Sequence, residues 1–254
     1  MRSITFIILF LVFLIQSCQE KNDLKAELLF KEGTIKLKSN ANEEALIQFR
    51  KALGLEVSDL LKATIYRNMS IAFQNVENID SATYYSRKGY EVAPSDSYIF
   101  YMNRAEYNLL SNDVHTAIQD LKSAKALDPL QMEVYQTLCL IYSGEYGDAY
   151  FEPQLSEVCA KKSVKLSPSN TTKEQLGSIY FQNEKYVEAV KIFAELYSKE
   201  PTNKRFEFFL GQSLYFAGDE RGGENHMKKA AERDEECKAM YHEIFEIGQN
   251  IDHE

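Results

Sequence analysis

Histidine, cysteine and clustered carboxylates are the side chains that could hold a metal ion or carry acid–base chemistry. The four histidines fall into no metal-ligand spacing and no H-E-x-x-H pattern, and no glycine-rich loop precedes a helix at phosphate-binding spacing. Because catalysis needs converging groups, we expect no catalytic site, no metal and no cofactor. The histidines are His115, His226, His242 and His253.

Carboxylate and aromatic side chains are concentrated in the segment "SGEYGDAYFEPQ", residues 143–154. Its acidic residues lack the regular alternation of a calcium-binding loop, so we expect no cation there. Its aromatic rings suit either anchors for a partner or contacts folded back onto the neighbouring turn, and the sequence leaves both uses open. These residues are Glu145, Asp148, Glu152, Tyr146, Tyr150 and Phe151.

Composition excludes one class of partner. The chain has 254 residues, of which 44% are hydrophobic, and a formal net charge of -9. Nucleic-acid binding needs a basic stripe facing the phosphates, and the lysines and arginines do not cluster into one. We therefore expect no nucleic-acid partner. Only five prolines and no tryptophan suit a helical body.

Small residues recur in pairs twelve positions apart. Two antiparallel helices approach to about 8 Å only where both present a small side chain, so each pair predicts a helix–turn–helix unit. A sixth pair, Cys139 and Ser156, is five residues wider, which the loop at 143–154 accounts for. The regular pairs are Gly33 and Ala45, Ser70 and Ala82, Ala105 and Ala117, Gly177 and Ala189, and Gly211 and Gly223.

The prolines mark the same period. Pro94, Pro129, Pro168 and Pro201 each stand twelve residues after the second small residue of a pair, where a residue that cannot continue a helix would end it. Four residues after that small residue the chain carries a large apolar side chain, for example Phe193. This spacing predicts one apolar face on each second helix.

The pattern resembles the tetratricopeptide repeat (TPR), a helix–turn–helix unit of 34 residues with L-G-x-x-Y, A-x-x-x-F and a closing proline. The stretch "LGSIYFQNEKYVEAVKIF", residues 176–193, carries the first two. The resemblance covers residues 26–237 and implies an all-α fold, an α–α superhelix (TPR solenoid) of about six repeats. Residues 238–254 are expected to form a capping helix and tail. The implied repeats begin near Ala26, Ala63, Tyr98, Met132, Asn170 and Lys204.

Three cysteines fall within this array: Cys139, Cys159 and Cys237. Cys139 and Cys159 lie in one repeat, but a disulfide needs Cα atoms within about 7 Å, and the second side chain is expected to turn partly away. Buried thiols are our preferred interpretation, and the bridge stays open as an alternative.

The resemblance also implies where a partner binds. The first helix of each repeat lines the concave side, so that an extended or helical peptide can lie along it. For the "FEFF" at residues 206–209, packing between repeats stays an equal alternative. The implied groove positions are Phe30, Arg67, Asn68, Ile71, Met102, Asn103, Leu109, Gln136, Leu140, Phe181, Phe208, Gln212 and Tyr215.

One subclass of the family grips carboxylate ends of its partners with lysine, asparagine and arginine at defined groove positions. Phe30 and Thr34 occupy the first pair here, and Ile99 and Asn103 the last; only Asn68 agrees. Because the cations that would hold the charge are missing, we expect no carboxylate clamp.

The N-terminus resembles an export signal. Arg2 precedes "ITFIILFLVFLI", residues 4–15, which is shorter than the about 20 residues of a membrane-spanning helix. The tetrad "IQSC" resembles the lipobox of bacterial lipoproteins, which implies removal of residues 1–17, lipidation of Cys18 and a tether over residues 18–25. An ordinary secretory signal or an uncleaved anchor are the alternatives. Gln19 resembles an outer-membrane sorting signal.

These features lead us to expect a scaffold that is anchored by a lipid in the cell envelope and mediates protein–protein interactions. The expected role is of the assembly, secretion or protease-adaptor type, at the outer membrane on its periplasmic face or the cell surface. The expected partners are other envelope proteins or peptides. The alternative is a periplasmic or surface binding protein for an envelope glycan or another small ligand, which would stack on Phe181, Phe208 and Tyr215.

Overall fold

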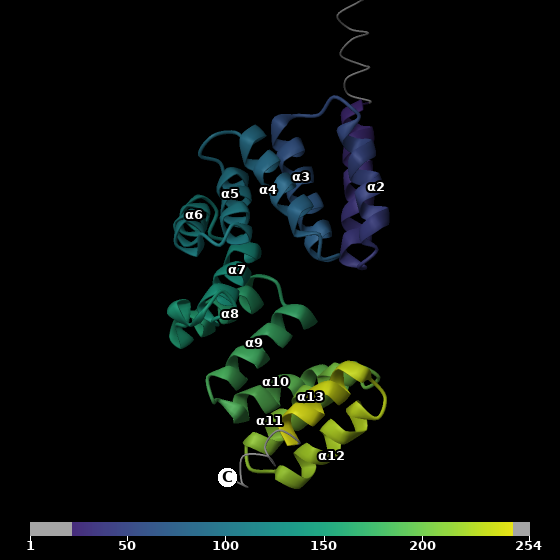
Figure 1. The fold of residues 1–254 in the computed structure, drawn as a ribbon, viewed down its shortest axis with the longest axis vertical. Helices are drawn as coiled ribbons and strands as arrows, with labels where there is room; N and C mark the ends of the chain where they lie inside the picture. The colour runs from purple at the N-terminus through teal and green to yellow at the C-terminus, as the bar shows by residue number, and fades with distance from the viewer. Residues whose placement is uncertain (1–21, 246–254) are drawn as a thin grey trace, which may run out of the picture. The chain divides into compact units, whose positions relative to one another are not determined.

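The computed structural model describes residues 22–245. The predicted signal peptide, the lipidation of Cys18 and the end of the tail lie outside the described residues. Within these residues every regular element is a helix (Figure 1), which confirms the all-α prediction. The chain divides into two compact units, unit 1 within Met1–Pro129 and unit 2 within Leu130–Glu254.

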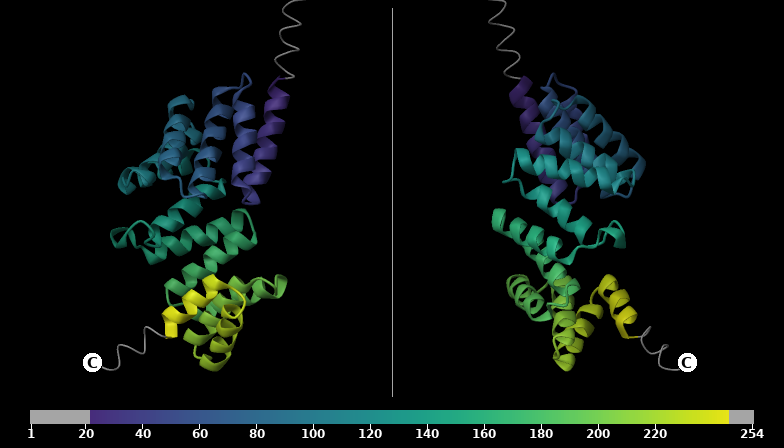
Figure 2. Two further views of the ribbon diagram at one scale, coloured as in Figure 1. Left: turned by 45° about the vertical axis from the view of Figure 1, so that its right-hand side comes forward. Right: turned by 90° about the vertical axis from the view of Figure 1, so that its left-hand side faces the viewer.

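Unit 1 contains three helix pairs. The first helix spans residues 22–38 and comes before α2. Residues 22–25 of the predicted tether are thus part of this helix. In each pair a short turn joins the two helices. The first helix (purple) lies at the outer edge of the unit with α2 beside it (Figure 2). The remaining helices are α2 (Asn42–Leu53), α3 (Asp59–Gln74), α4 (Ile79–Val92), α5 (Tyr98–Leu110) and α6 (Val114–Leu127).

Unit 2 contains three further pairs and a closing helix. The inserted loop forms a short 3-10 helix between the members of its first pair. The helices are α7 (Met132–Tyr142), η1 (Asp148–Tyr150), α8 (Pro153–Leu166), α9 (Asn170–Gln182), α10 (Tyr186–Lys199), α11 (Lys204–Phe216), α12 (Glu220–Ala231) and α13 (Glu235–Phe245).

The closing helix α13 begins earlier than the predicted cap at residue 238. The Cys237 backbone N–H donates to Asp234 Oδ1 at 3.0 Å, so Asp234 accepts from the first turn of the helix. Cys237 is buried in a cluster with Phe208, Met227 and Ala230. The early start therefore places one more turn of α13 against α11 and α12, and the apolar end of the unit is covered.

The helix starts follow from short polar side chains. In seven helices the residue before the first turn accepts a hydrogen bond from the backbone N–H three residues later, which satisfies a donor that has no partner within the helix. These capping residues are Ser58, Asn78, Ser97, Asp113, Ser169, Asn203 and Asp219.

The turns inside five pairs share one backbone feature. In each, a residue with positive φ stands two positions before the second helix. A left-handed residue reverses the chain after the first helix, and glycine or asparagine adopts that conformation at least cost. Two of the five are glutamates, so these turns hold their conformation without the favourable residue type. The five residues are Asn40, Glu77, Asn112, Glu184 and Gly218.

The paired small residues lie where the sequence analysis expects helix contacts, but they make two kinds of contact. At Gly211 and Gly223 the two backbones touch: a Cβ on Gly223 would lie 2.5 Å from the carbonyl oxygen of Gly211. At Gly177 a Cβ would lie 2.9 Å from the ring of Phe193. The small residue there makes room for a large ring rather than for a second small side chain.

Replacing Gly223 by alanine should destabilise unit 2. Neither backbone of the α11–α12 crossing can move away from the new methyl group, so we expect Gly223→Ala to lower the free energy of unfolding by about 1–3 kcal/mol. Gly54→Ala is the matched control, because a Cβ there meets its nearest atom at 3.4 Å in ordinary helical backbone. Urea denaturation followed by circular dichroism measures both, and equal midpoints would contradict the backbone contact.

A buried asparagine ties neighbouring pairs of unit 1 together. Asn103 on α5 donates from Nδ2 to the Ile99 carbonyl at 2.9 Å and to the Ala63 carbonyl on α3 at 3.3 Å. A Cβ on Gly89 of α4 would overlap the same amide group. Asn103 therefore joins α3, α4 and α5 at one point.

The contact between Gly89 and Asn103 predicts coupled effects of mutation. Gly89→Ala alone should cost about 1–3 kcal/mol, because the methyl group displaces the Asn103 amide. In an Asn103→Ala background the same change should cost less, by at least about 0.5 kcal/mol, since the overlapping group is gone. Urea denaturation of wild type, both single variants and the double variant gives the coupling. Strict additivity would show that the two side chains do not share this space.

Candidate functional site

The carboxylate of Glu106 on α5 contacts three polar side chains of α3. Glu106 Oε1 accepts from Ser70 Oγ at 3.0 Å and from Gln74 Nε2 at 2.5 Å, and Arg67 Nε lies 3.7 Å from Oε2. The side chains of Arg67 and Glu106 are only 11% and 13% exposed. The predicted groove residue Arg67 is thus already engaged, and the network links α3 to α5.

For two residues of unit 1, the prediction that they line the groove is wrong. Met102 and Asn103 are buried, because they face the neighbouring helices rather than the open side of α5. Asn68 donates from Nδ2 to Thr34 Oγ1 at 3.2 Å, and the Phe30 ring lies 6.1 Å from the ring of Phe49. The half-buried residues that keep some exposed surface are Phe30, Arg67, Asn68, Ile71 and Leu109.

In unit 2 the prediction for Phe208 is wrong. Its side chain is 0% exposed and packs with Met227, Ala230 and Cys237, because α13 covers this face of α11. Phe208 therefore neither lines a groove nor offers a stacking platform to a glycan. Of the two uses left open for residues 206–209, packing is the one that the structure shows, since Phe209 stacks on Phe193 at 5.4 Å. The remaining predicted positions are Leu140, which is exposed, and the half-buried Gln136, Phe181, Gln212 and Tyr215.

Phe181 belongs to an aromatic cluster with Tyr186 and Phe216, where α9 ends, α10 begins and α11 ends. The ring centroids lie 5.3 Å apart for Phe181 and Tyr186, 5.4 Å for Phe181 and Phe216, and 5.5 Å for Tyr186 and Phe216. Phe216 is 45% exposed. Tyr215 meets Phe216 edge-on at 5.5 Å and so continues the cluster. The exposed ring of Phe216, packed against Phe181 and Tyr186, is thereby open to a partner.

The sequence analysis missed Tyr186 and Phe216. Both stand at helix ends, Tyr186 as the first residue of α10 and Phe216 as the last of α11. The repeat pattern gives no signal for either, because Glu220 stands one 34-residue repeat after Tyr186 and Gln182 one repeat before Phe216. The groove positions that the TPR resemblance implies lie on the concave side of the repeats and do not include the turns where Tyr186 and Phe216 lie.

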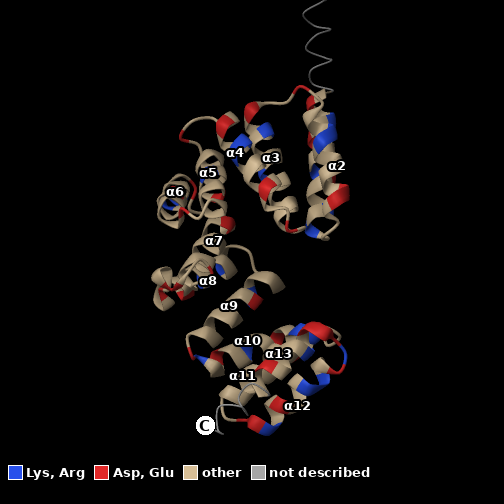
Figure 3. Cartoon of the chain, viewed as in Figure 1, with Lys and Arg blue, Asp and Glu red and all other residues tan. Residues whose placement is uncertain are grey.

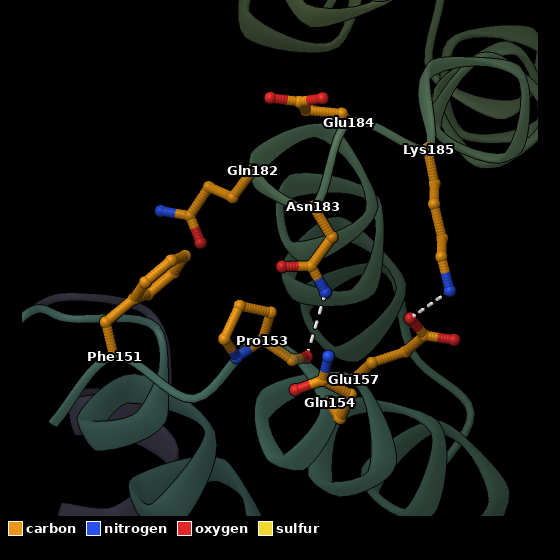
Figure 4. Close-up of a pocket in the computed structure, with 8 residues that line it drawn as sticks. All are labelled: Phe151, Pro153, Gln154, Glu157, Gln182, Asn183, Glu184 and Lys185. Atoms are coloured by element: carbon orange, nitrogen blue, oxygen red, sulfur yellow. Dashed lines mark hydrogen bonds and ion pairs between the residues drawn. The ribbon is translucent and has the colours of Figure 1, made fainter.

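The inserted loop borders a hollow of about 290 Å³. Asn183 Nδ2 donates to the Pro153 carbonyl at 2.9 Å and Lys185 Nζ pairs with Glu157 Oε2 at 2.6 Å, both visible in Figure 4. Phe151 forms one wall and is partly exposed, whereas Tyr146 and Tyr150 are half-buried. The lining residues are Phe151, Pro153, Gln154, Glu157, Gln182, Asn183, Glu184 and Lys185.

Two lysines set the ionisation of Glu157 at this hollow. Burial raises the pKa of Glu157, but hydrogen bonds from Lys161 and Lys185 lower it by more, so that its pKa lies below the ordinary value of 4.5. Lys161 Nζ and Lys185 Nζ each lie 2.6 Å from a carboxylate oxygen. The site can therefore hold a charged pair, with Glu157 ionised at neutral pH.

Three buried cysteines lie within the helices of unit 2. The structure records Cys139, Cys159 and Cys237 as buried thiols rather than disulfides. Burial raises the pKa of Cys139 to about 12, and nearby Cys159 adds to the effect. Burial likewise raises the pKa of Cys237 to about 12, with a further contribution from Asp234. A thiol with so high a pKa is unreactive at neutral pH.

Charges of both signs are interspersed over the helices of each unit (Figure 3). Within residues 22–245, no three His, Cys, Asp or Glu side chains gather where they could hold a metal ion. None of the described helices has the length and hydropathy needed to cross a membrane. In unit 2, the aromatic cluster and the hollow beside the loop are thus two features that the geometry leaves available for binding.

The ion pairs at the hollow predict a pH-dependent contribution to stability. A lowered pKa in the folded state stabilises the fold at pH values above the unfolded pKa, near 4.5, and this contribution is lost as the pH falls through the lowered pKa. We expect Glu157→Gln to lower the free energy of unfolding by about 1 kcal/mol at neutral pH, because the lysines are half exposed, and by progressively less below pH 4.5. Urea denaturation across this range measures it.

Glu145→Gln is the control, since Glu145 is exposed and lies in the loop outside any helix. It should leave the free energy of unfolding unchanged at each pH. A cost of Glu157→Gln that stays constant down to strongly acidic pH would show that packing of the side chain, not its charge, is lost.

Comparison with known proteins finds similarity in structure alone. No family model and no curated protein matches the sequence. A TPR protein of Thermus thermophilus is 14% identical, with a TM-score of 0.59 over 74% of this chain and 98% of that one. PilF of Pseudomonas aeruginosa is 17% identical, with a TM-score of 0.58 over 88% and 99%. YrrB, described as a TPR protein with an unusual peptide-binding site, is 15% identical, with a TM-score of 0.51 over 67% of this chain and 85% of that one. These likenesses show that the chain has the TPR solenoid fold.

Proposed function

We propose that this chain is a lipid-anchored scaffold that binds other proteins of the cell envelope. The observation that carries the proposal is the aromatic cluster of Phe181, Tyr186 and Phe216, displayed on a TPR fold with the ring of Phe216 open to solvent. Exposed, well-packed aromatic rings are common anchors at protein interfaces. The resemblance of "IQSC" to a lipobox supports the anchor.

The cluster suits a peptide segment with an aromatic or aliphatic side chain. Phe216 is supported on two sides by Phe181 and Tyr186, so its ring loses little freedom when a partner binds. YrrB, which has a similar fold, is titled as having a peptide-binding site, and we extend that kind of partner to this chain. The net charge of -9 favours partners with basic residues around the anchoring side chain.

Truncating Phe216 should weaken partner binding without loss of folding. The full-length protein and its Phe216→Ala variant are crosslinked in envelope preparations, and the captured proteins are quantified by mass spectrometry. We expect the variant to lose most of one set of partners, because removing an interface anchor typically costs about 2 kcal/mol or more, roughly thirtyfold in affinity.

Val187→Ala is the matched control, since Val187 is an exposed apolar residue of the same unit outside the cluster. It should capture the same partners as wild type. Equal capture by Phe216→Ala and Val187→Ala would exclude the cluster as the binding surface.

A further inference from the structure

The first helix, residues 22–38, carries apolar residues on two opposite sides. Leu29, Phe30 and Leu37 pack against the core of unit 1, and Ala26 and Gly33 on the same side are buried. With 3.6 residues per turn, a second set falls on the other side of the helix. A helix that packs on one side only needs one apolar face, so this helix presents an apolar surface that unit 1 does not cover.

The second set forms a stripe of large aliphatic side chains, which we call the outer stripe. Its members are 60% exposed at Leu24, 57% at Leu28 and 66% at Ile35. They lie close to one line along the helix, because they are four and then seven residues apart. The helix lies at the outer edge of its unit (Figure 2). The outer stripe lies on the side opposite the residues that pack against the core, so it faces away from that core.

Two lysines share the line of the outer stripe. Lys31 and Lys38 are exposed and fall on the same side of the helix as Leu24, Leu28 and Ile35, and the exposed Glu27 lies at the edge of that side. Lysine covers apolar surface with its methylene stem while its ammonium group reaches the polar layer. Aliphatic residues mixed with lysine on one face are typical of helices that lie in a membrane interface. Lys36 on the adjoining side pairs instead with Glu44 of α2 at 2.6 Å.

The position of the stripe in the chain limits its distance from the proposed anchor. Leu24 follows Cys18 by six residues. A fully extended chain spans at most about 3.3–3.6 Å per residue, so Leu24 lies within roughly 20 Å of a lipid on Cys18. A lipid on Cys18 would thus keep the beginning of the stripe near the bilayer surface.

We propose that the outer stripe is a membrane-contact face, which lies along the lipid surface with Leu24, Leu28 and Ile35 at the level of the headgroups and acyl ends. The assignment depends on the lipid anchor of the proposed function. It extends that function, because a chain held only by its tether would turn freely, whereas this contact fixes the first helix parallel to the bilayer. Anionic headgroups match the charge of Lys31 and Lys38.

The absence of tryptophan from the sequence gives a direct test. Leu28→Trp places a single fluorescent reporter in the stripe, and Tyr84→Trp places one at a similarly exposed site on α4 as the matched control. Full-length proteins purified from membranes are reconstituted into vesicles of phosphatidylethanolamine and phosphatidylglycerol. We expect Leu28→Trp to emit at shorter wavelength and to lose most of its intensity to brominated lipid, while Tyr84→Trp responds to aqueous iodide instead.

Three results would overturn the proposal, and they differ from one another. Mass analysis of the mature N-terminus without a lipid on Cys18 would refute the anchor and this orientation together. A lipidated protein in which Leu28→Trp is as open to iodide as Tyr84→Trp would refute the contact alone. A blue shift that grows with protein concentration and ignores brominated lipid would assign the stripe to a second copy of the chain. Ile35→Trp repeats the measurement should Leu28→Trp fail to fold.

Discussion

Close approach of paired helices is the constraint on which both units depend. At Gly211 and Gly223 the backbones of α11 and α12 are in contact, and no side chain fits between them. At Gly33 and Gly177 the missing side chain is filled by the rings of Phe49 and Phe193, which are themselves buried. In both arrangements the contact sets the distance between the two helices of the pair. It also fixes the direction in which the second helix presents its apolar face to the next repeat.

Polar groups then specify how successive elements meet. In unit 1, Arg104 pairs with the buried Asp120 through Nε at 3.0 Å and Nη2 at 2.6 Å, and Asn108 donates to the same carboxylate at 3.1 Å. In unit 2, the buried Glu207 of α11 pairs with Arg233. A buried charge without a partner is costly, so each group disfavours any other pairing of its helices. Apolar packing drives association, and these groups select one register.

The repeats could be predicted from the sequence because their cause is local. The twelve-residue spacing of small residues and the closing prolines depend only on chain geometry, and α5, α7, α9 and α11 begin at Tyr98, Met132, Asn170 and Lys204. The groove residues could not be predicted in the same way. Whether Phe208 or Phe209 faces outward depends on how α11 is rotated against α12 and α13, which is set by packing across repeats. Phe208 is buried for that reason, although it sits at a position that the resemblance implies for the groove.

The aromatic cluster and the outer stripe, two of the apolar surfaces exposed within residues 22–245, differ in what they can recognise. Phe216 is held by rings at 5.4 Å and 5.5 Å, so it offers a fixed shape, and a fixed shape discriminates between side chains at little entropic cost. Leu24, Leu28 and Ile35 stand along one helix, with the exposed Lys31 between Leu28 and Ile35. Such a surface has no defined cavity and gains chiefly from the area it removes from water, which a fluid bilayer provides as well as any protein. Shape therefore favours a protein partner at the aromatic cluster and a lipid surface at the outer stripe.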